Sequence, residues 1–169
     1  MSMRIQSICT AIAVAAGVTV LAAAPASASG SPHFIKHLTK VTDADLSSIT
    51  VAFKEAGLES GAVETITVTA HLEATYQCVN RGGHNPDDPK KTVVSGDYSK
   101  SGEFKAARNG NVTGSLTVTA PAPGTVLDCP RGQTAKHTVS TWSSISIADE
   151  DTLATIALPG THAFGEPVD

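Results

Sequence analysis

Histidine and acidic side chains are the residues of this chain whose types and spacing could support metal chemistry. His33 and His37 are four residues apart, which would place both imidazoles on one face of a helix, but no third ligand lies near them. Possible oxygen ligands of the kind that calcium prefers are Asp43, Asp45, Asp87, Asp88 and the run from Asp149 to Asp151. None has the spacing of a known calcium loop, which favours solvated turns. We therefore expect no metal and no cofactor.

Motifs that mark catalytic sites are not found in the sequence. It has no G-x-S-x-G elbow, no H-E-x-x-H helix, no phosphate loop and no G-x-G-x-x-G turn. We therefore expect a non-catalytic protein. Because a catalytic triad is defined by geometry, a secreted hydrolase with an unrecognised site stays open as an alternative. A protease inhibitor that presents the segment 121–130 as bait is another.

The segment from Asn80 to Lys91 is the best candidate for a binding surface. It contains two Gly, two Pro, two Asn and two Asp, a composition typical of a loop. Binding residues often lie on loops that a rigid frame holds in place. The candidate ligand-binding residues here are Asn80, Arg81, His84 and Asn85.

Trp142 is the one tryptophan of a chain with 4% aromatic residues, so any stacking site depends on it. In a regular strand, Val139, Ile145 and Ile147 would face the core and Trp142 would face solvent, where it could bind a sugar ring. A β-bulge near Ser143 would instead turn Trp142 inward. The sequence leaves both alternatives open.

The N-terminus is typical of a secretory signal peptide. Arg4 precedes an apolar run, and small residues around Ala26 and Ala28 form a cleavage site, so residues 1–28 are expected to be removed. Removing 28 of the 169 residues leaves 141, and the loss of Arg4 changes the formal charge from −4 to −5. We expect a secreted, extracellular protein with no remaining membrane span.

The charge and cysteine content of the exported chain limit its partners. A mildly acidic protein has no electrostatic footprint for nucleic acid or for an anionic membrane, so an unidentified extracellular ligand or cell-envelope component is the expected partner. Cys78 and Cys129 remain after cleavage, and an oxidising compartment favours a disulfide between them over free or metal-bound thiols.

Alternation of apolar and polar residues predicts β-strands. The clearest strand runs from Thr65 to Val79, where the even-numbered positions suit a core and the odd-numbered positions as far as Gln77 are polar. Further strands are expected near 49–54, 92–98, 103–108, 112–120, 136–147 and 153–158, with a break at 99–102. Residues 29–47 lack a sustained period and are expected to form a loose lead-in.

About seven short strands at roughly ten-residue spacing predict an antiparallel, two-sheet, immunoglobulin-like β-sandwich with one disulfide. We expect a single domain over residues 48–169. The Cys-x-Asn-x-Gly-Gly segment within 76–86, the run 109–114 and the D-C-P of 128–130 resemble a group of small secreted actinomycete proteins of unassigned function. This resemblance implies an extracellular β fold and implies no catalytic residue.

Overall fold

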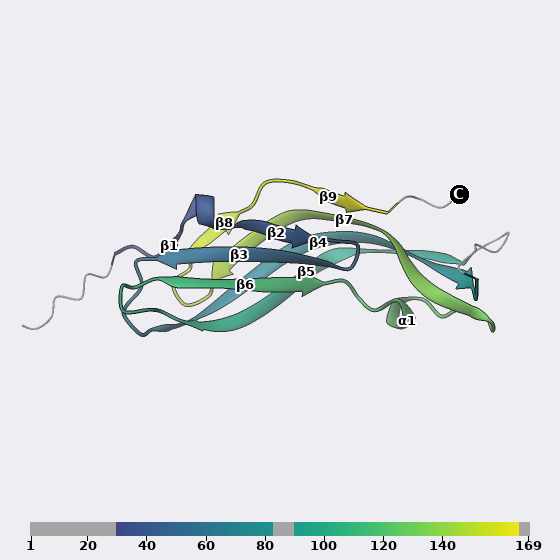
Figure 1. The fold of residues 1–169 in the computed structure, drawn as a ribbon, viewed down its shortest axis with the longest axis horizontal. Coiled ribbons are helices and arrows are strands. Elements are labelled where there is room, and N and C mark those ends of the chain that lie inside the picture. The colour runs from purple at the N-terminus through teal and green to yellow at the C-terminus, as the bar shows by residue number, and fades with distance from the viewer. Residues whose placement is uncertain (1–29, 83–89, 166–169) are drawn as a thin grey trace, which may run out of the picture.

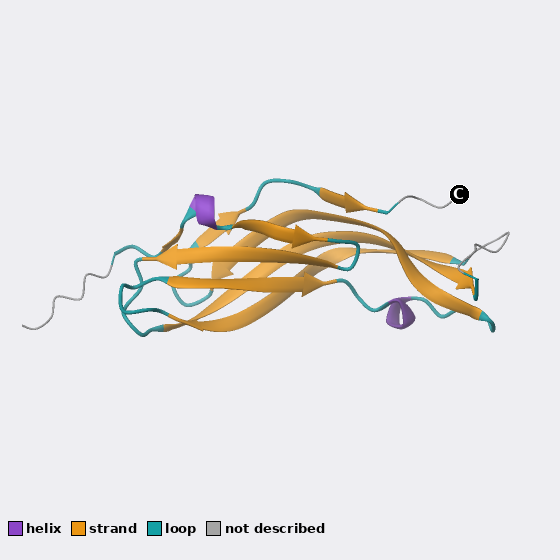
Figure 2. Cartoon of the chain, in the orientation of Figure 1, coloured by secondary structure: helices purple, strands orange, loops and turns teal. Residues whose placement is uncertain are grey.

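The computed structural model describes residues 30–82 and 90–165 and shows two antiparallel β-sheets packed face to face (Figures 1 and 2). The first sheet contains β1 (His33–Phe34), β2 (Lys40–Ala44), β3 (Ser48–Ala56) and β6 (Val112–Thr119). The second contains β4 (Val63–Asn80), β5 (Lys91–Lys105), β7 (Gln133–Asp149), β8 (Thr155–Ala157) and β9 (His162–Phe164). The predicted two-sheet sandwich is confirmed.

The core forms where the alternating strands of the two sheets face each other. In β3, Ile49, Val51 and Phe53 are buried, and in β4 every even-numbered residue from 64 to 78 is buried. A pleated strand separates its side chains onto two faces, so this alternation fixes which residues meet between the sheets. The predicted strand at 65–79 is confirmed as most of β4.

The disulfide between Cys78 and Cys129 is confirmed and has a Cα–Cα distance of 5.6 Å. It joins the end of β4 to the connection between β6 and β7, which includes the short helix α1 (Pro123–Val126). The Tyr76 hydroxyl donates a hydrogen bond to the Pro121 carbonyl oxygen, 2.8 Å away, and holds the same connection. This end of the molecule is therefore cross-linked both covalently and by hydrogen bonding.

The segment predicted as a loose lead-in belongs to the sandwich. Residues 33–34 and 40–44 pair with opposite ends of β3, and a short 3₁₀ helix, η1 (Lys36–Leu38), lies between them. A register shift between Val41 and Asp43 interrupts the alternation of β2, and most of its side chains are exposed. An edge strand of this kind leaves little period-two pattern for a sequence to show.

The break predicted at residues 99–102 is also wrong, because β5 is continuous and pairs with β4 over fifteen residues. The sequence Ser-Lys-Ser-Gly resembles a turn in composition. Its pairing with β4 nevertheless continues in unbroken register, from Ser99 opposite Thr69 to Gly102 opposite Ile66. Tertiary pairing thus overrides local turn preference here.

Trp142 is fully buried, so the alternative in which it is an exposed stacking platform is wrong. Thr69 of β4 pairs with Ser146 of β7, and His71 pairs with Ser143, so β7 has one extra residue between these two pairs. Ser144 lies in this bulge and has a φ of 48°. As a result, the buried residues of β7 are even-numbered before the bulge, at Ser140 and Trp142, and odd-numbered after it, from Ile145 onward. The inward alternative is therefore confirmed. The indole Nε1–H donates to the Asp45 carbonyl oxygen, 3.0 Å away.

Within the described residues, no helix is long and apolar enough to cross a membrane. The expected signal peptide, residues 1–28, lies outside the part of the chain that the structure describes.

Candidate functional site

Three strands place a carboxylate at a core-facing position where the sandwich opens at one end. Glu55 continues the buried face of β3, Glu64 begins that of β4, and Asp149 ends that of β7. The exposed fractions are 0%, 6% and 0%, respectively, so these side chains are not a solvated acidic rim. Acidic residues are almost never this buried without partners, which makes the end of the sandwich a candidate site.

Asp149 organises the turn that follows β7. Its Oδ1 accepts hydrogen bonds from the backbone N–H groups of Asp151 and Thr152, and its Oδ2 accepts one from the Thr152 hydroxyl, 2.7 Å away. The Leu153 N–H closes the turn by donating to the Asp149 carbonyl oxygen. This turn holds Asp151 beside β4, where its Oδ2 accepts a 2.7 Å hydrogen bond from the Thr65 N–H.

Glu55 lies beneath this turn. The Thr152 hydroxyl that hydrogen-bonds to Asp149 is also 3.4 Å from Glu55 Oε1, whereas Glu55 Oε2 is buried and has no hydrogen-bond partner within the described residues. Burial, together with the neighbouring charge of Asp149, raises the pKa of Glu55 from its usual value near 4.5 to about 8. Glu55 has no exposed surface, so it cannot contact a substrate as a general acid.

Glu64 and Asp151 lie at the open side of the same cluster. One carboxylate oxygen from each of Glu64, Asp149 and Asp151 lies within 4.8 Å of the others. Burial and then the charge of Asp149 raise the pKa of Glu64 above its usual value. Within the described residues, no lysine, arginine or histidine forms an ion pair with these carboxylates. The cluster therefore gathers carboxylates without a counter-charge from the part of the chain that the structure describes.

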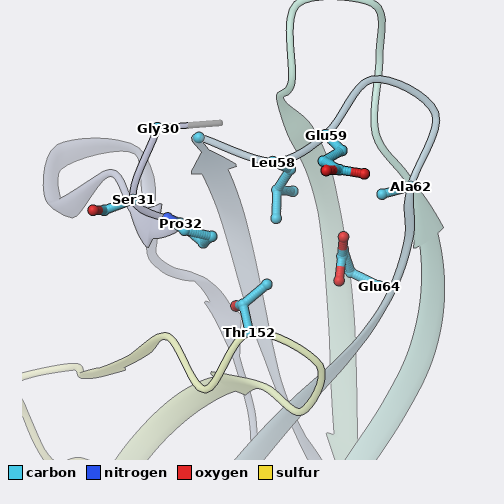
Figure 3. Close-up of a pocket in the computed structure, with 9 residues that line it drawn as sticks. Gly30, Ser31, Pro32, Leu58, Glu59, Ala62, Glu64 and Thr152 are labelled. Carbon is cyan, nitrogen blue, oxygen red and sulfur yellow. The ribbon is translucent and has the colours of Figure 1, made fainter. Parts of the chain in front are cut away.

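A pocket of about 490 Å³ opens onto this cluster. Glu64 and Thr152 line it, and the turn between β3 and β4 adds Leu58 and Glu59 (Figure 3). Figure 3 shows the carboxylates of Glu59 and Glu64 extending into the same space from the two ends of this connection. Gly30, Ser31 and Pro32 form the opposite wall. Water or a small ion can thus reach Glu64.

The residues predicted to bind a ligand from the loop lie at the other end of the molecule. Asn80 and Arg81 are exposed where β4 ends, close to the disulfide. His84 and Asn85 lie outside the described residues, as do Asp87 and Asp88. Trp142 is buried and joins neither group.

The histidine pair considered for metal binding is not assembled into a site. His33 lies in β1 and its Nδ1 is 2.8 Å from the Ser31 carbonyl oxygen, while His37 is exposed in η1. Within residues 30–82 and 90–165, the group of potential metal ligands whose atoms come together is Glu64, Asp149 and Asp151.

The connection considered as protease bait has a folded conformation. Residues 123–126 form one helical turn, and Leu127 is buried in the core. A bait loop must enter a protease in extended form, so this geometry does not favour the inhibitor alternative. The hydrolase alternative stays a prediction.

Sequence reasoning names Asp149 and Asp151 as possible calcium ligands but misses Glu55 and Glu64, because motif spacing is local and these residues lie in other strands. One signal was nonetheless present. Glu55 shares parity with Val51 and Phe53, as Glu64 does with Ile66 and Asp149 with Ile147. A carboxylate that continues an apolar face predicts an unusual buried charge.

Comparisons with known proteins identify no family. No family model matches the chain, and no curated protein matches it. One similar solved structure is Spo0M, the sporulation control protein from Bacillus subtilis, with 9% sequence identity and a TM-score of 0.30. The match covers 81% of this chain, which spans about half the length of that structure.

Proposed function

We propose that this protein is an exported, non-catalytic β-sandwich module that binds an anionic component of the cell envelope through its disulfide-linked end. The observation that carries the proposal is the set of exposed side chains on that cross-linked frame. Arg81 follows β4, Arg131 precedes β7, and Lys90 precedes β5. Lys90 Nζ donates to the Asp128 carbonyl oxygen, 2.8 Å away, so it is tied to the disulfide connection.

The frame supports recognition because it limits the motion of the groups that would contact a ligand. β4, β5 and β7 extend beyond β6 at this end (Figure 1), and the Cys78–Cys129 disulfide joins β4 to the adjoining connection. A backbone fixed in this way loses less conformational entropy on binding. The basic groups there supply attraction to phosphate or carboxylate polymers, and the asparagine at position 80 supplies hydrogen bonding.

Co-sedimentation of the purified exported protein with isolated cell envelopes tests the proposal. We expect saturable binding that weakens between about 25 and 300 mM NaCl, because exposed charges are screened by salt. The double variant Arg81→Ala/Arg131→Ala should lose roughly tenfold in affinity. A matched control, Lys100→Ala/Arg108→Ala, removes the same charge from exposed positions outside this end. No sedimentation, or an equal loss in the control, contradicts the proposal.

A further inference from the structure

The acidic cluster contains a buried group that points to a missing ligand. Glu55 has no exposed surface, and its Oε2 accepts no hydrogen bond from a donor in the described part of the chain. The Asp149 carboxylate beside it can form a hydrogen bond with Glu55 only while one of the two holds a proton. Its Oε1 shares the Thr152 hydroxyl with Asp149, which aims the Glu55 carboxylate at the cluster. A buried oxygen without a partner carries a desolvation cost that a bound cation would offset.

The chemistry of the other three carboxylates suits a hard cation that binds oxygen. Their ligand atoms lie within 4.8 Å of one another, close enough to bind one ion. Three carboxylates on one ion favour calcium, because magnesium dehydrates reluctantly and is usually held by one or two carboxylates and several waters. The set contains only oxygen donors, and structural zinc sites in contrast use mainly cysteine and histidine.

We propose that Glu64, Asp149 and Asp151 bind a calcium ion at this end of the sandwich, with Glu55 as a fourth carboxylate beneath it. Calcium takes six to eight oxygen ligands, and the pocket beside Glu64 has room for the waters that complete this number. Asp151 is exposed, so the ion has an entry path from solvent. Calcium would join the ends of β4 and β7 to β3 in the opposite sheet.

A carboxyl–carboxylate pair is the competing explanation for the same geometry. In that arrangement Glu55 keeps a proton that it shares with Asp149, and no metal enters. The two explanations differ in their response to calcium, because a shared proton would not make the protein's stability depend on millimolar calcium.

Isothermal titration calorimetry with CaCl₂ on the purified, chelator-treated protein is the direct test. We expect one saturable site with a Kd of about 0.1–1 mM, in the range of extracellular calcium modules, and much weaker binding of MgCl₂. In parallel, about 10 mM CaCl₂ should raise the Tm by roughly 3–6 °C. No saturable heat together with an unchanged Tm overturns the proposal, as does equal affinity for magnesium.

Two variants locate the site and leave in place Asp149, whose carboxylate holds the turn together. Glu64→Gln and Asp151→Asn should each weaken calcium binding at least about tenfold, because each replaces an anionic ligand by a neutral amide. Glu73→Gln and Asp43→Asn are matched controls at exposed positions outside the cluster and should bind as the unmodified protein does. Retained binding in both site variants, or equal weakening in the controls, overturns the assignment.

Glu55→Gln separates calcium binding from proton sharing. For a calcium site, this variant should bind calcium more weakly and show a smaller rise in Tm. A higher Tm in chelator with no response to calcium in either protein would assign the cluster to a shared proton and overturn the proposal. Envelope binding concerns the other end of the molecule and is measured separately, so either proposal can fail alone.

Discussion

Gly114 in β6 occupies a position that no larger residue fits without displacing aromatic rings. A Cβ atom built there would lie 2.4 Å from Phe104 Cε1 and 2.9 Å from Phe53 Cζ. These two rings form an edge-to-face pair with centroids 5.0 Å apart, so the glycine lets the β5 ring pack directly on the other sheet. We predict that Gly114→Ala destabilises the protein.

The magnitude follows from the contact distances. A normal carbon–carbon contact is about 3.5–4.0 Å, so the Phe104 ring must move by about 1 Å. Overpacking of this kind lowers the free energy of unfolding by about 1–3 kcal/mol. Alanine also has less backbone freedom than glycine in the unfolded chain, which raises the free energy of unfolding by about 0.4–1 kcal/mol. Phe104 is half-buried, so its ring can move partly away from the added methyl group. The expected net loss in free energy of unfolding is about 1–2 kcal/mol.

Urea denaturation followed by the fluorescence of Trp142, the single tryptophan, measures this loss. Gly96→Ala is the matched control, because no atom lies within 4 Å of a Cβ at Gly96. It should be neutral or stabilising by up to about 1 kcal/mol. Combining Gly114→Ala with Phe104→Leu should give less than the sum of the two single losses. Equal effects at both glycines, or full additivity in the double variant, would refute the steric explanation.

Three further predictions concern other parts of the fold. Replacing both Cys78 and Cys129 by Ala should lower the free energy of unfolding by about 4 kcal/mol, because the disulfide closes a loop with a sequence separation of 51. The variant and the reduced unmodified protein should unfold at the same urea concentration. Leu153 is 82% exposed at a φ of 63°, so Leu153→Gly should relieve about 1–2 kcal/mol of backbone strain, more than the about 0.4–1 kcal/mol that glycine's freedom in the unfolded chain costs. The Tm should therefore rise slightly, and a lower Tm would contradict this. Burial lowers the pKa of His137 below its usual 6.5. The unfolded chain is thus protonated first as the pH falls, and stability present above pH 6.5 declines below it. His137→Gln should lessen the decline between about pH 7.5 and 5.5, and an unchanged decline would count against it.

The parts of the fold that follow a simple repeat could be predicted from the sequence. The alternation from Thr65 to Tyr76 is strict, so both the strand and its buried face are predicted correctly there. From Tyr76 to Val79 all four residues are buried, including Gln77 on the face predicted to be polar. The disulfide was predictable because two cysteines remain after the expected cleavage. The strand is predicted from the pattern of neighbouring residues, and the disulfide is predicted from the number of cysteines.

The orientation of Trp142 depends on information that the sequence does not display. Its inward position requires one extra residue in β7, and the bulge lies at Ser144 with a positive φ. Glycine or asparagine would have signalled that conformation, whereas serine does not. The acidic cluster is non-local in the same way, since Glu55 and Asp149 meet only after the sheets pack. The predicted loop residues His84 and Asn85 lie outside the described part of the chain.

The long strand β5 forms one border of the second sheet and has consequences for how copies of the protein meet. An outer strand leaves hydrogen-bonding groups on one side, where a second chain can add as a further strand. Lys91, Asp97 and Lys100 are exposed along β5, with Glu103 and Lys105 beyond them. A neighbouring molecule that paired there would have to desolvate these charges. The strand whose turn-like sequence suggested a break thus has a composition that opposes edge-to-edge aggregation.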